Sequence, residues 1–124
     1  MIWFAVAVGG ACGSVARYAL SASLRTLIPG FPWGTLIVNV AGGLAMGAIT
    51  AYALARPGAL TEPLRLGLTT GILGGFTTFS AFSVETLLLW RDGSAAMAFA
   101  NLAANVVFSL AACALGLWLG RQLA

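Results

Sequence analysis

The chain has 124 residues, of which 60% are hydrophobic and only 7% are charged, with a formal net charge of +3 and a mean hydropathy of +0.99. Soluble domains carry roughly 25% charged residues, so this composition excludes a soluble domain and indicates a single-domain integral membrane protein over residues 1–124. Histidine and lysine are absent, which removes most imidazole and Schiff-base chemistry, and the six arginines are scattered instead of clustered as nucleic acid binding requires.

Four apolar stretches follow one another along the chain, and each is long enough to cross a membrane. A helix needs about 20 apolar residues to cross the hydrocarbon core. The predicted spans cover residues 2–24, 33–54, 66–90 and 94–119, and glycine-containing turns connect them. No basic segment precedes the first stretch, so we expect a retained span instead of a cleaved signal peptide. The predicted fold class is an all-α membrane protein with four transmembrane helices.

The arginines are divided almost evenly between the two sides of the membrane, so they barely favour one orientation. An even number of spans places both termini on one side, together with the second connector. Three arginines lie on that side, Arg56, Arg65 and Arg121, whereas Arg25 and Arg91 lie on the other side with Arg17 close to it. Asymmetry in arginine and lysine sets orientation. Either one arginine decides a single topology, or both orientations are made and pair as an antiparallel dual-topology homodimer, which we favour.

The third predicted span contains polar groups that are energetically unfavourable in lipid. Residues 74–83 read Gly-Gly-Phe-Thr-Thr-Phe-Ser-Ala-Phe-Ser, with two adjacent glycines and four hydroxyls in mid-span. These residue types favour a helix that is broken at mid-membrane and whose free backbone groups are satisfied by protein or by an ion. The alternative is an intact helix whose hydroxyls bond back to the preceding turn.

The fourth span carries a strip of uncharged polar groups at intervals of four residues, which places them on one helical face. The strip consists of Asn101, Asn105, Ser109 and Cys113. Amides and hydroxyls donate hydrogen bonds without net charge, so the strip suits an anion path, whereas a cation path would more naturally use carboxylates or carbonyl rings. Such strips also act as plain contacts between helices, and both interpretations stay open.

Three other observations concern five side chains. Asn39 is the only carboxamide of the second span. Phe79 and Phe82 are three residues apart and share a face if their segment is helical. Phenyl edges are partly positive and can lean toward an anion, although most such phenylalanines contact lipid or the core. Cys12 and Cys113 both lie in apolar runs, and we expect packing residues instead of a disulfide.

Three groups of residues, taken in chain order, resemble the Fluc (CrcB) family of fluoride channels. They are Gly9-Gly10 with Gly13 and Arg17-Tyr18, then Gly34-Thr35-Leu36 with Asn39 and Gly42, and then the segment from Gly74 to Glu85. The resemblance covers essentially the whole chain. Its third segment is highly specific, whereas the glycine pairs alone would not be.

The resemblance implies a channel that exports cytoplasmic fluoride passively across the inner (plasma) membrane of a bacterium. It implies an antiparallel homodimer with two pores and a central structural sodium ion (Na+), bound at the helix breaks by backbone carbonyls of Gly74 and Thr77. By the same resemblance, Arg17 lies at a vestibule and raises the local anion concentration. The implied pore residues are Asn39, Phe79, Phe82, Ser80, Asn105 and Ser109. Cys113 departs from the hydroxyl expected at the end of this polar track.

Two other functions compete with the channel. A small multidrug-resistance-type proton-coupled exporter also has four spans, but its coupling would need a carboxylate in the first span, and residues 2–24 contain none. Glu85, in the third span, is the substitute that such an exporter would have to use. The second alternative is an assembly subunit that transports nothing. An enzyme is not expected, because no nucleophile–base pair is present.

Overall fold

The chain folds into helices without strands, and four of its helical stretches are long and apolar enough to cross a membrane. The computed structural model describes residues 1–124. Helix α1 spans Ile2–Leu27, α2 spans Trp33–Ala55 and α6 spans Ala95–Gln122. The third span consists of α3 (Glu62–Leu66), the π-helical segment η1 (Gly67–Leu73), α4 (Gly74–Phe76) and α5 (Phe79–Arg91). The predicted all-helical fold with four spans is confirmed.

The connectors between the spans turn at glycines with positive φ. Gly30, Gly58 and Gly93 have φ values of 100°, 87° and 82°, a region that residues with a Cβ rarely adopt. The third span begins at Glu62 instead of residue 66, because Pro63 lies in its first turn, where its missing N–H has no helical partner to lose. Part of the expected second connector is therefore helix.

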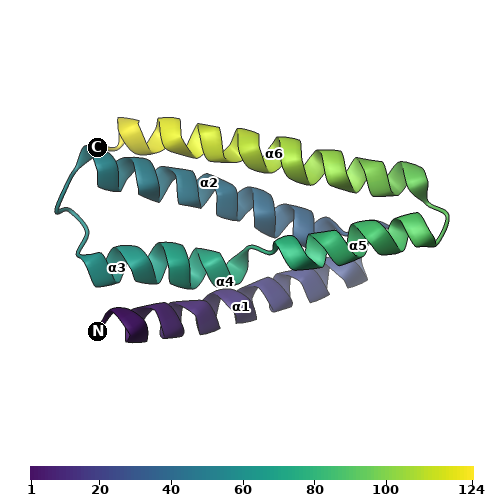
Figure 1. Cartoon of the computed structure of the whole chain (residues 1–124), viewed down its shortest axis with the longest axis horizontal. Coiled ribbons are helices and arrows are strands. Elements are labelled where there is room, and N and C mark those ends of the chain that lie inside the picture. The colour runs from purple at the N-terminus through teal and green to yellow at the C-terminus, as the bar shows by residue number, and fades with distance from the viewer.

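Two close helix contacts depend on glycine. One joins α2 to α6, and the other joins α1 to η1 and α4 (Figure 1). A Cβ added to Gly116 would lie 2.9 Å from the backbone nitrogen of Ala48 on α2. A Cβ added to Gly13 would lie 2.9 Å from the backbone nitrogen of Phe76 on α4. Small residues at such contacts let the helix backbones approach one another closely.

The third span changes its packing partner halfway along its length. Its first half, through η1 and α4, packs on α1, whereas α5 packs mainly on α6. Figure 1 shows the consequence: α3 lies beside α1 near the two termini, and α5 lies beside α6 toward the opposite end of the molecule. The segment between α4 and α5 therefore crosses from one part of the bundle to another.

This crossing segment is the predicted helix break. Thr77 has φ −80° and ψ 158°, and Thr78 has φ −153° and ψ 118°, so both residues are extended (Figure 1, between α4 and α5). The alternative of an intact helix is wrong. Gly74 and Gly75 remain helical within α4, and the extended residues are two threonines, whose β-branched side chains favour extended backbone.

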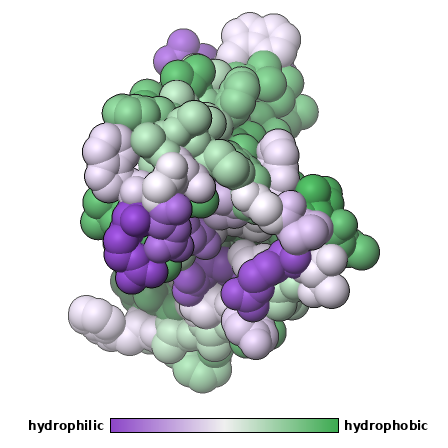
Figure 2. Space-filling model, turned by 90° about the vertical axis from the view of Figure 1, so that its right-hand side faces the viewer, coloured by the Kyte–Doolittle hydropathy of each residue, from purple (hydrophilic) through white to green (hydrophobic).

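Hydrophilic residues lie at an end of the bundle, whereas large apolar residues are exposed along its length. Figure 2 shows hydrophilic residues gathered at the end of the molecule that lies opposite the termini, where Arg91 forms an exposed ion pair with Asp92 at 3.0 Å. Along the bundle many large apolar side chains are exposed, including Trp3, Phe4 and Leu110. An apolar exterior of this kind is suited to contact with lipid or with another apolar protein surface.

The glycine contact between α2 and α6 leads to a stability prediction. Gly116→Ala should destabilise the protein by about 1–3 kcal/mol, because the new methyl group collides with the α2 backbone near Ala48. The matched control is Gly10→Ala, where a Cβ meets nothing within 4 Å. This control should leave stability unchanged or raise it, since alanine is the better helix former. Equal unfolding free energies of the two variants in detergent would contradict the packing argument.

Candidate functional site

A groove of about 440 Å³ runs beside the helix break and holds most of the predicted site residues. Residues of α2, of the break, of α5 and of α6 form its walls. The lining residues include Asn39, Thr77, Thr78, Phe79, Phe82, Asn105, Ser109 and Cys113. No charged side chain lines the groove. It is therefore an uncharged space in which amides, hydroxyls and phenyl rings from distant parts of the sequence come together.

Asn39 on α2 forms hydrogen bonds to the backbone of the break. Its Oδ1 accepts a hydrogen bond from the Thr78 N–H at 2.8 Å, and its Nδ2 donates to the Thr78 carbonyl at 3.1 Å. A single amide therefore satisfies both backbone groups of the extended residue. The Thr78 hydroxyl accepts a hydrogen bond from the N–H of Ala81 at 3.1 Å and so caps the first turn of α5.

Hydrogen bonds continue from Asn39 across α6 to α5. Asn39 Nδ2 donates to Asn105 Oδ1 at 3.0 Å. Asn105 Nδ2 donates to the carbonyl and to Oδ1 of Asn101, at 3.0 and 2.9 Å. Asn101 Nδ2 donates to the Thr86 hydroxyl at 2.8 Å, which in turn donates to the Phe82 carbonyl at 2.8 Å. We call this run, made of Asn39, Asn105, Asn101 and Thr86, the amide relay.

The predicted strip on α6 is thus divided between two environments. Asn105, Ser109 and Cys113 line the groove, whereas Asn101 is fully buried and lies in the relay. The Ser109 hydroxyl is buried and has no hydrogen-bond partner. Ser80, at the break, lies 3.3 Å from the Thr78 hydroxyl. The Ser109 hydroxyl therefore supplies an uncommitted polar hydrogen at the groove.

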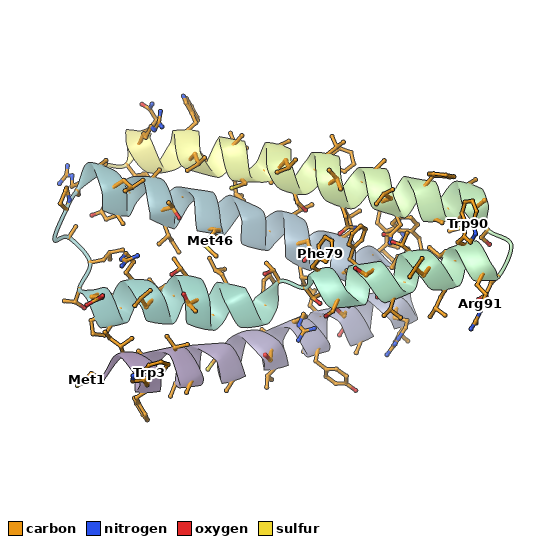
Figure 3. All side chains as sticks on the ribbon, in the orientation of Figure 1. Met1, Trp3, Met46, Phe79, Trp90 and Arg91 are labelled. Carbon is orange, nitrogen blue, oxygen red and sulfur yellow. The ribbon has the colours of Figure 1, made fainter.

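Phe79 and Phe82 contact each other as a pair, with ring centroids 5.4 Å apart and an interplanar angle of 66°. Both rings line the groove, as their spacing predicts. Phe82 is only 5% exposed, whereas Phe79 is 79% exposed and projects from the start of α5 (Figure 3). One ring is thus fixed by packing, and the other forms part of an open surface.

Arg17 and Thr77 lie on the α4 side of the break. The Arg17 Nε donates to the Gly75 carbonyl at 3.1 Å, so the half-buried guanidinium lies against the end of α4. The Thr77 hydroxyl and N–H both donate to the Leu73 carbonyl at 2.9 Å. Cationic groups are favourable at a helix C-terminus, where carbonyls carry partial negative charge.

Glu85 lies outside the groove in a second cavity of about 360 Å³, which it shares with Arg25 and Asp92. Its Oε1 accepts a hydrogen bond from the Thr35 hydroxyl at 2.8 Å, while its Oε2 is buried without a partner. The sequence offered no signal for this contact, because Thr35 is distant in the chain and fits an apolar helix pattern.

The cysteines form no disulfide. Cys113 is half-buried at the groove, but Cys12 is exposed on α1. The expectation that both are packing residues fits Cys113, whereas for Cys12, which is exposed on this single chain, it stays a prediction. Residues that sequence reasoning missed are Thr78 and Thr86, because ordinary helix hydroxyls give no sign of a distant amide partner.

Comparison with known proteins identifies the family of the chain. A sequence model described as CrcB-like protein, Camphor Resistance (CrcB), matches residues 4–117, which is most of the chain. This chain belongs to the CrcB family. The resemblance drawn from its motifs is therefore confirmed.

Its CrcB relatives are bacterial proteins of nearly the same length. One from Paracoccus denitrificans (strain Pd 1222), named fluoride-specific ion channel FluC, is 51% identical over 118 residues that cover 95% of this chain and 93% of the relative. Another of that name, from Geobacter sulfurreducens, is 50% identical over 117 residues, covering 94% and 90%. Together with the four spans, these relatives indicate a bacterial multi-pass membrane protein.

The contact between Asn39 and Thr78 leads to the second prediction. Asn39→Leu keeps a similar volume but leaves the N–H and carbonyl of Thr78 without partners. We expect a loss of about 1–3 kcal/mol for each orphaned group, measured as unfolding free energy in detergent. Ser83→Ala is the control, because the Ser83 hydroxyl bonds only to the Phe79 carbonyl of its own helix. Equal stability of the two variants would show that Asn39 does not hold the break.

Proposed function

We propose that this CrcB protein is a fluoride-selective channel. The observation that carries the proposal is the groove beside the break, where uncharged hydrogen-bond donors and phenyl edges meet without a fixed charge. Its relatives from Paracoccus denitrificans and Geobacter sulfurreducens are named fluoride-specific ion channels, which supports the same substrate. The activity is passive transport and not catalysis.

The chemistry of the groove suits a small, strongly hydrated anion. A selective pore must replace the water around such an ion with well-placed donors, and a fixed positive charge would hold the ion too tightly. Hydroxyls and the positive edges of phenyl rings meet both requirements, and the two amides line the path with their donors bonded within the protein. We assign the path to Asn39, Phe79, Phe82, Ser80, Asn105 and Ser109.

The proposed conducting unit is an antiparallel homodimer with two pores. The groove is open on one side, and Phe79, Val106 and Leu110 at or beside its walls are exposed. A second copy would close it. The near-even division of arginines between the two sides supports assembly from both orientations. Insertion in the bacterial inner membrane would then let fluoride leave the cytoplasm down its gradient.

The break also fits a structural sodium ion. The N–H of Thr78 is bonded to Asn39, and the N–H of Ala81 is bonded to the Thr78 hydroxyl. The carbonyls of Gly74 and Thr77 therefore lack the N–H that a continuous helix would provide four residues later. Hard cations take oxygen ligands, and no cluster of histidine, cysteine or acidic side chains offers an alternative metal site. We assign these two carbonyls to sodium.

Arg17 would contribute positive charge near the path. Because its Nε is engaged by the Gly75 carbonyl, it attracts anions from a fixed position beside the break. This placement keeps the charge outside the groove itself. Anions would be concentrated there without being trapped in the narrow part of the path.

The direct test is fluoride efflux from liposomes that contain the purified protein, with chloride efflux as the control and no imposed pH gradient. We expect rapid loss of fluoride while chloride is retained. Retention of both ions by folded protein would refute the channel. If fluoride efflux requires a proton gradient and disappears in the Glu85→Gln variant, the result would instead support the proton-coupled exporter.

Replacement of the phenylalanine pair tests the path itself. Phe79→Ile or Phe82→Ile removes the phenyl edge but keeps an apolar side chain. Because an aromatic contact is worth about 0.5–1.5 kcal/mol, we expect fluoride flux to fall by up to about tenfold. The control is Phe4→Ile, because Phe4 is an exposed residue near the start of α1 and does not line the groove. Unchanged flux in both pore variants would remove these rings from the path.

Orientation can be tested through the weak arginine bias. Two extra arginines in the connector at residues 56–61 should force one topology, and a chain expressed alone should then conduct no fluoride. Co-expression with a chain biased in the opposite direction should restore flux. Glutamines at the same positions are the control. Full activity of the one-way chain alone would contradict antiparallel assembly.

A further inference from the structure

The amide relay leaves few hydrogens for a passing anion. Each asparagine amide carries two N–H hydrogens. Asn39 directs its pair to the Thr78 carbonyl and to Asn105 Oδ1. Asn105 directs its pair to the carbonyl and Oδ1 of Asn101. The two amides that line the groove therefore donate all their hydrogen bonds to acceptors within the protein, whereas the buried Ser109 hydroxyl has no partner.

Both ends of the relay lie on the same turn of the third span. One end holds the backbone of Thr78, and the other ends at the Phe82 carbonyl through the Thr86 hydroxyl. Phe79 lies between these two attachment points, and Phe82 is one of them. The relay passes from α2 to α6 and returns to α5, so it sets the position of this turn relative to both neighbouring helices.

We propose that Asn101 and Thr86 are positioning residues for the conduction path, which rests on the proposed channel function. Neither residue lines the groove. Asn101 is fully buried, and its Nδ2 donor is directed to Thr86. This bond orients the Asn101 Oδ1 that receives Asn105, and through Asn105 it orients the amide of Asn39. The relay holds the break and the phenylalanine pair, while free hydroxyls such as that of Ser109 meet the anion.

Thr86→Val is the variant that tests this role. Valine has nearly the same shape but no hydroxyl, so a buried N–H of Asn101 loses its acceptor. Fluoride flux in liposomes should fall by up to about tenfold, on the argument that the free energy of one lost buried hydrogen-bond partner then raises the barrier to conduction. Thr86→Ser restores the acceptor and should restore the flux. The matched control is Thr26→Val, because the Thr26 hydroxyl also bonds to the carbonyl four residues earlier but belongs to no relay.

Amide hydrogen exchange separates positioning from a general loss of structure. In Thr86→Val, exchange should rise in the peptide covering residues 77–82, which contains the Thr78 N–H, and stay unchanged where η1 packs on α1. A uniform rise along the chain would assign Thr86 an ordinary stabilising role. Wild-type flux in Thr86→Val, with wild-type liposomes conducting, would overturn the proposal. Failure of the wild-type liposomes would overturn the proposed function instead.

A measurement on the unmodified protein does not depend on any variant folding. Nuclear magnetic resonance of asparagine-labelled protein reports exchange of the side-chain amide hydrogens with water. We expect the amides of Asn39, Asn101 and Asn105 to exchange slowly, because all are engaged in the relay. Fast exchange at Asn39 or Asn105 would show that these donors are open to the groove, and the proposal would fail.

Discussion

A backbone that leaves the helical conformation inside a membrane must find new partners for its N–H and C=O groups, because lipid offers none. In this chain one side chain meets that demand at Thr78: Asn39 bonds to both the N–H and the carbonyl of this residue. The consequences reach both halves of the third span. The first half stays packed on α1, and the second half is free to pack on α6. Without a partner for Thr78, an unbroken helix would satisfy the backbone better, and the crossing between the two halves would disappear.

The break shapes the proposed path as well as the fold. Since two N–H groups near the break bond to side chains, the carbonyls of Gly74 and Thr77 lose the partners that a continuous helix would give them, and the proposed sodium site rests on this loss. On the α5 side, the same crossing brings Phe79 and Phe82 to the groove that Ser109 of α6 also lines. The groove remains uncharged, while Arg17 holds its charge on the α4 side. In the proposed channel, the positive group that attracts anions and the neutral donors along the path thus occupy different places.

Local signals in the sequence predicted the parts of this arrangement that depend on residue type and spacing. Hydropathy predicted four spans, and the glycine and hydroxyl content of residues 74–83 predicted the break. The four-residue spacing predicted that Asn105 and Ser109 would face the same way. The bond from Asn39 to Thr78 and the bond from Asn101 to Thr86 join residues on different helices. No local pattern encodes such pairs, and for that reason the position of the break within the segment and the relay became visible only in the folded chain.

The central claim is that an uncharged, donor-lined path beside the break carries fluoride passively and selectively. Current recorded across a planar bilayer that contains the purified protein tests it most directly. A fluoride gradient is set up across the bilayer, together with a chloride gradient in the opposite direction. A passive fluoride path predicts a current that reverses at the equilibrium potential of fluoride and ignores the chloride gradient. Reversal that follows chloride or the proton gradient, or the absence of current from folded protein, would contradict the account.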